Sequence, residues 1–229
     1  MKNFSFILIL FAIFCIACNN TAPQNANGDT AKEAQMRAEG LVDIHDLDST
    51  IAVDLIYAKP YNFMGKVLYH NVNKAFMLPE AAEKLVKANR LLKSIRPDLN
   101  LIVYDAARPI SVQRAMRKSV EGTEFERFVA DGTRGGRHNY GVAVDVALVD
   151  CTGHPIPMGS EYDYFGDRSR ADLEIELFEK GEINRRELLN RRLLREIMTE
   201  AGWLVEPSEW WHFNAMPIAE ASKKLPVIK

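Results

Sequence analysis

The pattern of hydrophobic and polar positions divides the chain from residue 41 onward into short strands and longer helices. Three segments carry hydrophobic residues at helical spacing, which predicts amphipathic helices at 79–95, about 111–120 and 184–201. Short runs of branched and aromatic residues predict strands at 51–57, 99–105, 142–149 and 203–205. Pro79 near the start of the first helix and Gly202 after the last one agree with this division.

The predicted strands and helices are interspersed without a regular strand–helix–strand repeat, and residues 151–170 are loop-rich, with several glycines and prolines. This order favours an α+β fold with a small, mostly antiparallel sheet and flanking helices. The chain has 229 residues, of which 47% are hydrophobic and 26% are charged, as is usual for globular proteins. We therefore expect one folded domain over residues 41–229.

The amino terminus has the pattern of an export signal. Lys2 precedes an apolar run over residues 4–17 that is too short to cross a bilayer comfortably and is typical of a signal peptide. The run ends at Ala17-Cys18, which resembles a bacterial lipoprotein signal, although Cys15 stands where that motif usually has leucine. We expect residues 1–18 to be this signal, Cys18 to carry lipid, and the protein to be periplasmic or on the cell envelope. Ordinary signal cleavage is the alternative.

Residues 19–40 are polar and contain almost no large hydrophobic side chains, so we expect a flexible tether there. Cys151 is the one cysteine beyond the signal, which excludes a disulfide within the expected domain. The formal net charge is -2 and no basic cluster is present, which gives no electrostatic reason to expect a nucleic-acid partner.

Two short stretches carry the candidate chemistry, His138 to Asp145 and Glu209 to His212. Together they supply two imidazoles and two carboxylates, and a mononuclear zinc hydrolase needs three such ligands and a nearby base. Residues seven apart on a strand face opposite sides, so His138 and Asp145 cannot both bind one ion from a single straight strand. His138 can instead sit in a loop that curls back, for which Gly141 provides flexibility. Asp145 lies among valines and alanines, where a carboxylate is costly unless it is paired or bound to a metal. A structural salt bridge is the alternative.

The neighbouring residues support this chemistry less directly. Glu209 is placed to transfer protons next to a metal, but it is equally placed to be a surface carboxylate. Arg108 follows the strand at 99–105 and precedes a proline. Beside a zinc site it would be placed to stabilise an oxyanion, and on the surface it would have no special role. Trp210 and Trp211 would line the site or belong to the core. The remaining histidines are expected to have no special role: His45, His70 and His154.

Several ordered segments resemble the zinc D,D-peptidases, a group with a hedgehog-like fold, and more closely the VanX-like D-alanyl-D-alanine dipeptidases of peptidase family M15. They lie between residues 42 and 214 and are Tyr57 with Asn62-Phe63-x-Gly65-Lys66, Asp105-x-x-Arg108-Pro109, His138-x-x-Gly141-x-Ala143-x-Asp145, Pro157-Met158-Gly159-Ser160-x-x-Asp163, residues 190–194, and Glu209-Trp210-Trp211-His212. One departure is Gly136, because the family usually has a serine two residues before the first histidine.

The resemblance implies a role for each of these positions. One Zn²⁺ would bind to His138, Asp145 and His212, with Glu209 as the general base and acid and Arg108 as the arginine that stabilises the transition state. Tyr57 and Asp163 match positions near the dipeptide, where Asp163 would hold the ammonium group. The alternative for Asp163 is a solvated loop acid. Gly136 weakens the inference about the substrate more than the inference about catalysis.

The expected function is zinc-dependent hydrolysis of D-alanyl-D-alanine or a similar small D,D-dipeptide. The alternative within the same chemistry is a D,D-carboxypeptidase or endopeptidase that acts on peptidoglycan. The alternative of another class is a zinc-stabilised binding module of the envelope, against which Glu209 and Arg108 argue because binding alone requires neither.

Overall fold

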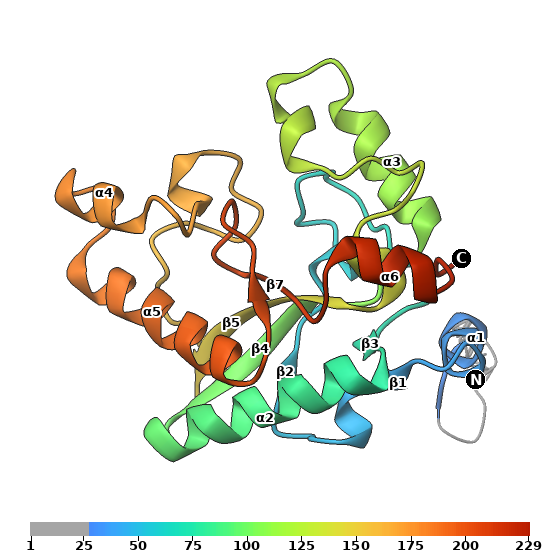
Figure 1. Cartoon of the computed structure of the whole chain (residues 1–229), viewed down its shortest axis with the longest axis horizontal. Coiled ribbons are helices and arrows are strands. Elements are labelled where there is room, and N and C mark those ends of the chain that lie inside the picture. Colours follow the sequence, from blue (N-terminus) through green and yellow to red (C-terminus); the bar gives the residue numbers. More distant parts are fainter. Residues whose placement is uncertain (1–27) are drawn as a thin grey trace, which may run out of the picture.

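The computed structural model describes residues 28–229 (Figure 1). The expected signal over residues 1–18, with Cys18, lies outside this range. The helices of the described residues are α1 (Ala31–Ala38), α2 (Pro79–Ile95), α3 (Ile110–Val120), α4 (Glu174–Glu179), α5 (Arg185–Glu200) and α6 (Ile218–Lys224). Their strands are β1 (Val42–Asp43), β2 (Ala52–Val53), β3 (Phe76–Met77), β4 (Leu99–Asp105), β5 (Ala143–Asp150), β6 (Leu204–Val205) and β7 (His212–Asn214).

A five-stranded sheet in the order β2-β4-β5-β7-β6 forms the centre of the molecule. Only the pairing of β2 with β4 is parallel, and the other neighbours in this sheet are antiparallel. The α+β fold with a small, mostly antiparallel sheet is confirmed. Strands β1 and β3 form a separate antiparallel pair.

The strand predicted at 51–57 is shorter than expected. Only β2 has strand geometry there, and after it the chain turns into the 3₁₀ helix η2 (Ile56–Ala58). The Asp54 amide donates the last hydrogen bond to β4, at the Val103 carbonyl. This turn moves Tyr57 away from the sheet ladder and buries its side chain.

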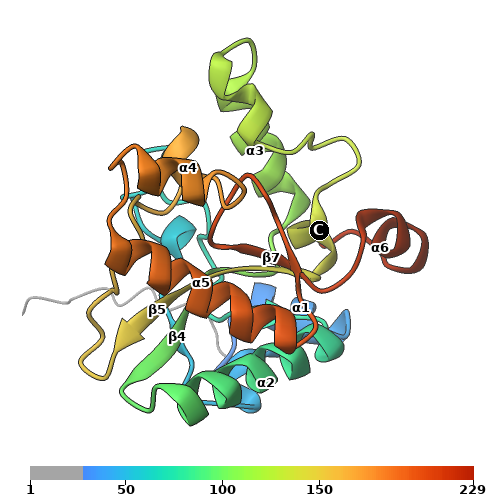
Figure 2. The ribbon, with the colours of Figure 1, turned by 60° about the vertical axis from the view of Figure 1, so that its left-hand side comes forward.

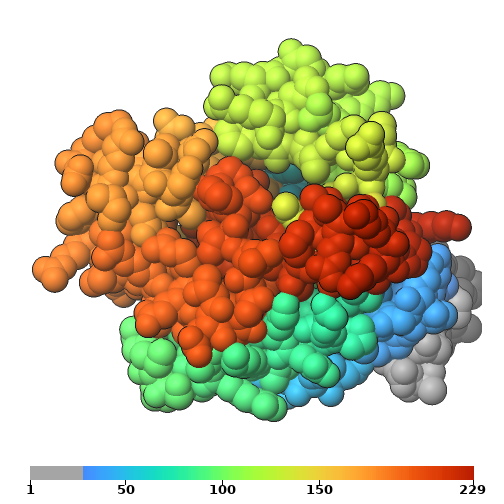
Figure 3. All heavy atoms as spheres, viewed as in Figure 1, coloured from blue at the N-terminus to red at the C-terminus, as the bar shows by residue number. Residues whose placement is uncertain are grey.

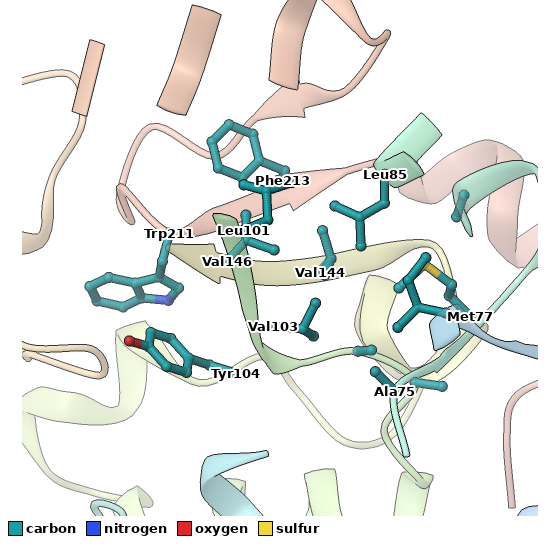
Figure 4. Packing of buried hydrophobic residues seen from close by; sticks show 14 of the residues in the cluster. Ala75, Met77, Leu85, Leu101, Val103, Tyr104, Val144, Val146, Trp211 and Phe213 are labelled. Carbon is teal, nitrogen blue, oxygen red and sulfur yellow. The ribbon is translucent and has the colours of Figure 1, made fainter. Parts of the chain in front are cut away.

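Helices α2 and α5 lie side by side against one face of the sheet (Figures 1 and 2). The hydrophobic core fills the space between them and the strands, and Figure 4 shows Leu85 of α2 next to Val144 and Phe213. The apolar positions of α2 and α5 recur at helical spacing because they form this buried face. Helix α3 lies on the opposite side of the sheet from α2, so the two sides are covered differently.

The prediction of a flexible tether over residues 19–40 is wrong for residues 31–38. Residues 31–38 form α1, whose capping box joins Thr30 and Glu33, and Met36 is fully buried in the core. Glu33 also accepts a hydrogen bond from the Asn73 amide at 2.7 Å. The segment was misjudged because it is held by one methionine and by polar contacts rather than by a hydrophobic stripe. Within residues 28–229 no helix has the length and apolar character needed to cross a membrane.

Candidate metal centre and cleft

His138 is held in a short 3₁₀ helix, η4 (Arg137–Tyr140), that leads into β5. The loop predicted around His138 is confirmed. It ends at Gly141, whose φ of 69° lies in the left-handed region and whose missing Cβ would approach Leu41 to 2.9 Å. The His138 carbonyl accepts a hydrogen bond from the Arg108 amide, which joins this turn to the end of β4.

Asp145 and His212 are neighbours on adjacent strands. Antiparallel pairing of β5 with β7 places Asp145 directly opposite His212, and Asp145 is buried. The carboxylate therefore meets an imidazole from a strand that lies more than sixty residues later in the chain. Sheet register, rather than a local motif, brings these two side chains together.

The ligand atoms of His138, Asp145 and His212 lie within 4.8 Å of one another. Asp145 Oδ1 is 3.3 Å from His138 Nε2 and 3.0 Å from His212 Nδ1, and the two nitrogens are 3.2 Å apart. The structure thus brings all three predicted ligand residues to one point.

The outer nitrogens of both imidazoles have acceptors of their own. His138 Nδ1 is 2.7 Å from the Ala106 carbonyl, and His212 Nε2 is 2.8 Å from Asn214 Oδ1. A neutral imidazole carries one proton, and these contacts place it on the outer nitrogen, so the inner nitrogen presents a lone pair. Two lone pairs and a carboxylate oxygen therefore face each other without a donor between them.

A bound cation would satisfy this arrangement. Asp145 Oδ1 is buried and has no hydrogen-bond partner among the described residues, whereas Asp145 Oδ2 accepts a bond from the Tyr162 hydroxyl at 2.8 Å. Burial raises the pKa of Asp145, but His138 and His212 outweigh this effect and lower it, while the pKa of His138 is raised by Asp145 despite burial. Two neutral imidazoles and one carboxylate fit a divalent metal of the zinc type.

Glu209 lies beside this cluster without joining it. Its Oε2 is 3.6 Å from His212 Nδ1, and its side chain lines the same cavity. Burial raises the pKa of Glu209 to about 8, against the opposing effect of His212. A carboxyl group with a pKa near neutrality can both accept and return a proton at physiological pH.

Arg108 is fixed by a network of side chains at the end of β4. Its Nε and Nη2 donate to Asp105 Oδ2 at 2.9 and 2.5 Å, and its Nη1 donates to Gln113 Oε1 at 2.7 Å. Tyr69 donates to the other oxygen of Asp105 at 2.6 Å. The guanidinium also lies 5.1 Å from the centre of the Tyr57 ring, so the charge is held in one place at the cavity wall.

Tyr57 and Asp163 meet across 106 residues of sequence. The Tyr57 hydroxyl lies 2.9 and 3.1 Å from the two Asp163 carboxylate oxygens. Asp163 has a φ of 58°, a left-handed conformation that is uncommon for residues other than glycine but is tolerated by aspartate. Burial raises the pKa of Asp163 to about 8, and the Tyr57 hydrogen bond opposes this shift. Asp163 is thus a partly buried cavity residue and not a solvated loop acid.

These groups line a cavity of about 240 Å³. In Figure 3 the surface is hollowed between the yellow-green region of α3 and the red segment that precedes α6. Trp211 lines the cavity and packs against Tyr162, whereas Trp210 points to Ser160 and lines a different hollow. This volume is below the ~300–1,000 Å³ of typical ligand pockets, which favours a small substrate.

The histidines expected to have no special role all lie outside this cavity. His45 is 2.9 Å from the Ile51 carbonyl, and His154 lies in an exposed turn close to Asp150. His70 is exposed.

Sequence reasoning assigned no role to three residues of the site. Asp105 and Gln113 hold Arg108, and Tyr162 contacts the oxygen of Asp145 that faces away from the histidines. An aspartate at the end of a buried strand, three residues before a candidate arginine, was a signal for Asp105. Nothing in the local pattern marks Gln113 or Tyr162, because their partners are brought to them by the tertiary structure.

Comparison with known proteins gives consistent matches. A family model described as D-ala-D-ala dipeptidase, of the peptidase M15 group, matches residues 37–226. A D-alanyl-D-alanine dipeptidase of Escherichia coli (strain K12) is 31% identical over 174 residues, which are 76% of this chain and 83% of that protein. One of Enterococcus faecium is 31% identical over 178 residues, 70% of this chain and 83% of that protein. One of Synechocystis sp. is 30% identical over 165 residues, 58% of this chain and 66% of that protein.

Proposed function

The chain belongs to the D-ala-D-ala dipeptidase family of metallopeptidases, and we propose that it hydrolyses D-alanyl-D-alanine or a similar small D,D-dipeptide with one zinc ion per chain. The observation that carries this proposal is the convergence of two imidazole lone pairs and an unpaired, buried carboxylate oxygen inside a small cavity. His138, Asp145 and His212 would hold the zinc ion. When bound, zinc acts as a Lewis acid and makes water more acidic.

Glu209 is the proposed general base and acid. It accepts a proton from the attacking water and passes that proton to the amine that leaves when the peptide bond breaks. Its position 3.6 Å from a proposed ligand nitrogen and its pKa of about 8 suit both halves of this transfer.

Arg108 is the proposed donor to the oxygen of the scissile carbonyl, which gains negative charge as the tetrahedral intermediate forms. Asp105 and Gln113 hold the guanidinium before the substrate arrives, so little reorganisation is needed during the reaction. Tyr57 and Asp163 are the proposed site for the ammonium group of the dipeptide, since a partly buried carboxylate that is left without a cation is unfavourable.

The proposed activity is tested by measuring D-alanine release from D-alanyl-D-alanine with zinc-loaded protein. Chelation should abolish the activity and zinc should restore it, while Glu209→Gln should retain zinc and lose a factor of about 10² or more in kcat. The activity proposal fails if zinc-loaded protein releases no D-alanine. The role of Glu209 fails if the variant turns over normally.

The peptidase alternatives differ in how they treat the amino end of the substrate. A carboxypeptidase or endopeptidase accepts a blocked amine, whereas a dipeptidase with Asp163 at its ammonium site should cut N-acetyl-D-alanyl-D-alanine about 100-fold less efficiently. Equal kcat/KM for the free and blocked peptides would favour the carboxypeptidase. Absence of hydrolysis with zinc bound would favour a binding module.

The proposed location is the bacterial cell envelope, with lipid on Cys18. This proposal rests on the apolar run over residues 4–17 that ends at Ala17-Cys18. Full-length protein expressed in bacteria should partition into detergent, and Cys18→Ser should be released or remain unprocessed. Identical partitioning of the two forms would favour ordinary secretion.

A further inference from the structure

Groups that contact the cleft come from both edges of the central sheet. Tyr57 follows β2 at one edge, Asp145 lies in β5 at the centre, and Glu206 follows β6 at the other edge. The proposed ammonium site is therefore on the β2 side of the metal cluster. The carboxylate end of a bound dipeptide would point toward β6, and the cavity lining there includes Arg137, Glu206 and Ser208.

Arg137 is oriented toward this end of the cavity by Glu206. Its Nη1 is 3.5 Å from Glu206 Oε2, which is long for a hydrogen bond between charged groups. The Ser208 hydroxyl donates to the other Glu206 oxygen at 3.1 Å and so fixes the carboxylate. Arg137 immediately precedes His138, so its backbone is held by the same turn that positions the proposed metal ligand.

The guanidinium of Arg137 has unused donors. Its Nε is buried and has no hydrogen-bond partner among residues 28–229, although the side chain as a whole is 31% exposed at the cavity. An arginine presents five N–H donors, and the long contact with Glu206 uses at most one of them. Nη2 has no hydrogen-bond partner among these residues and is not one of the buried atoms, so it can donate to an acceptor that enters the cavity.

Two other arginines line the cavity, and neither is as well placed for the C-terminal carboxylate of the substrate. Arg108 already uses three of its five N–H donors on Asp105 and Gln113, and we have assigned it to the oxygen of the scissile carbonyl. Arg127 is exposed, with its guanidinium stacked 4.8 Å from the centre of the Phe128 ring. Gly136, beside Arg137, provides no side-chain donor. Arg137 is thus the cavity arginine whose partners leave the most binding capacity.

We propose that Arg137, held by Glu206, binds the C-terminal carboxylate of the dipeptide. The enzyme would then be specific for substrates in which the residue after the scissile bond is the last residue of the peptide. This inference rests on the proposed dipeptidase function. A planar guanidinium matches a carboxylate through two parallel N–H donors, which gives both charge and direction. With Asp163 at the other end, the cleft would recognise both charged ends of a free dipeptide.

The experiment compares D-alanyl-D-alanine with D-alanyl-D-alaninamide, which has the same scissile bond but no terminal negative charge. Zinc-loaded wild-type protein should cut the amide with a kcat/KM about 100-fold lower, because the site then contains an arginine without its anion. In Arg137→Gln this ratio should fall below about 10, mainly through a higher KM for the free acid. Arg137→Lys should give an intermediate ratio, since lysine retains the charge but not the planar donors.

The matched control is Arg127→Gln, which removes the exposed arginine of the same cavity and should leave the ratio at the wild-type value. Zinc content is measured for every variant, because Arg137 adjoins His138. Equal cleavage of acid and amide by the wild type, or an unchanged ratio in Arg137→Gln with zinc bound, would overturn the role of Arg137 while the dipeptidase activity stands. Cleavage of neither peptide would overturn the dipeptidase function itself, and the inference with it.

Discussion

The proposed metal centre and the proposed ammonium site lie in the same cavity but are built in different ways. Asp145 and His212 belong to paired strands, and the backbone ladder between β5 and β7 fixes their separation. Tyr57 and Asp163 belong to a 3₁₀ turn and an irregular loop, and their own side chains provide the contact. Strand pairing holds the ligand atoms in fixed positions, as the coordination of a metal ion requires. Loops vary more easily, which suits the residues that select a substrate.

Tyr162 joins the two regions. Its hydroxyl donates to Asp145 Oδ2 in the metal cluster, and its ring packs against Tyr57 on the other side. It also adjoins Asp163 in the chain. The two regions are built differently, but Tyr162 contacts both. A substitution of this residue should therefore affect both.

The largest expected effect is on zinc binding, and it distinguishes the proposed metal centre from the proposed ammonium site. His212→Ala removes a proposed ligand from a strand and should reduce bound zinc below one tenth of an equivalent and abolish hydrolysis, because the remaining two ligands no longer close the site. Asp163→Asn should keep zinc and lose activity only on the free dipeptide. Elemental analysis and kinetics of both variants provide the measurement. If Asp163→Asn lost zinc as well, the regions would not be independent.

A smaller effect is expected at the residue that joins them. Tyr162→Phe removes the hydroxyl that orients Asp145 and should weaken zinc affinity by about 10-fold, as loss of a hydrogen bond to a metal ligand commonly does. Competition with a chelator of known affinity measures this change. Tyr164→Phe is the control, since Tyr164 is two residues away but stacks with Arg168 and does not line the cavity. Equal affinities in both variants would remove Tyr162 from the metal site.

A third expected effect is on the pH dependence of stability. Burial raises the pKa of Asp163 to about 8 from an ordinary value of 3.8, so the folded protein binds a proton that the unfolded chain has lost between these pH values. The free energy of unfolding should therefore fall as pH rises from about 5 to 8. Urea denaturation of chelated protein measures this fall. Asp163→Asn, which cannot ionise, should show a shallower dependence, and an identical slope would show that Asp163 does not contribute.

Much of the fold was predictable from the sequence. Helix α2 was predicted at its observed bounds, and β4, β5 and α5 within about a residue, because each buries a stripe or face whose spacing is visible in the chain. The short elements escaped this reasoning. Helix α1 was mistaken for part of a tether because one methionine and a capping box hold it, and the strand at 51–57 was overextended because η2 interrupts it.

The sequence by itself also determined the chemistry that the site can perform. A carboxylate among valines requires a partner, for which the residues alone left a metal and a salt bridge open. The resemblance of the ordered segments to the zinc D,D-peptidases indicated a metal hydrolase. Only the tertiary structure decided how these groups meet. The register of β5 against β7 joins Asp145 to His212, and the loop after β5 brings Asp163 to Tyr57. Pairs such as Arg108 with Gln113 and Arg137 with Glu206 depend on how separate segments pack, and no local pattern in the chain encodes that.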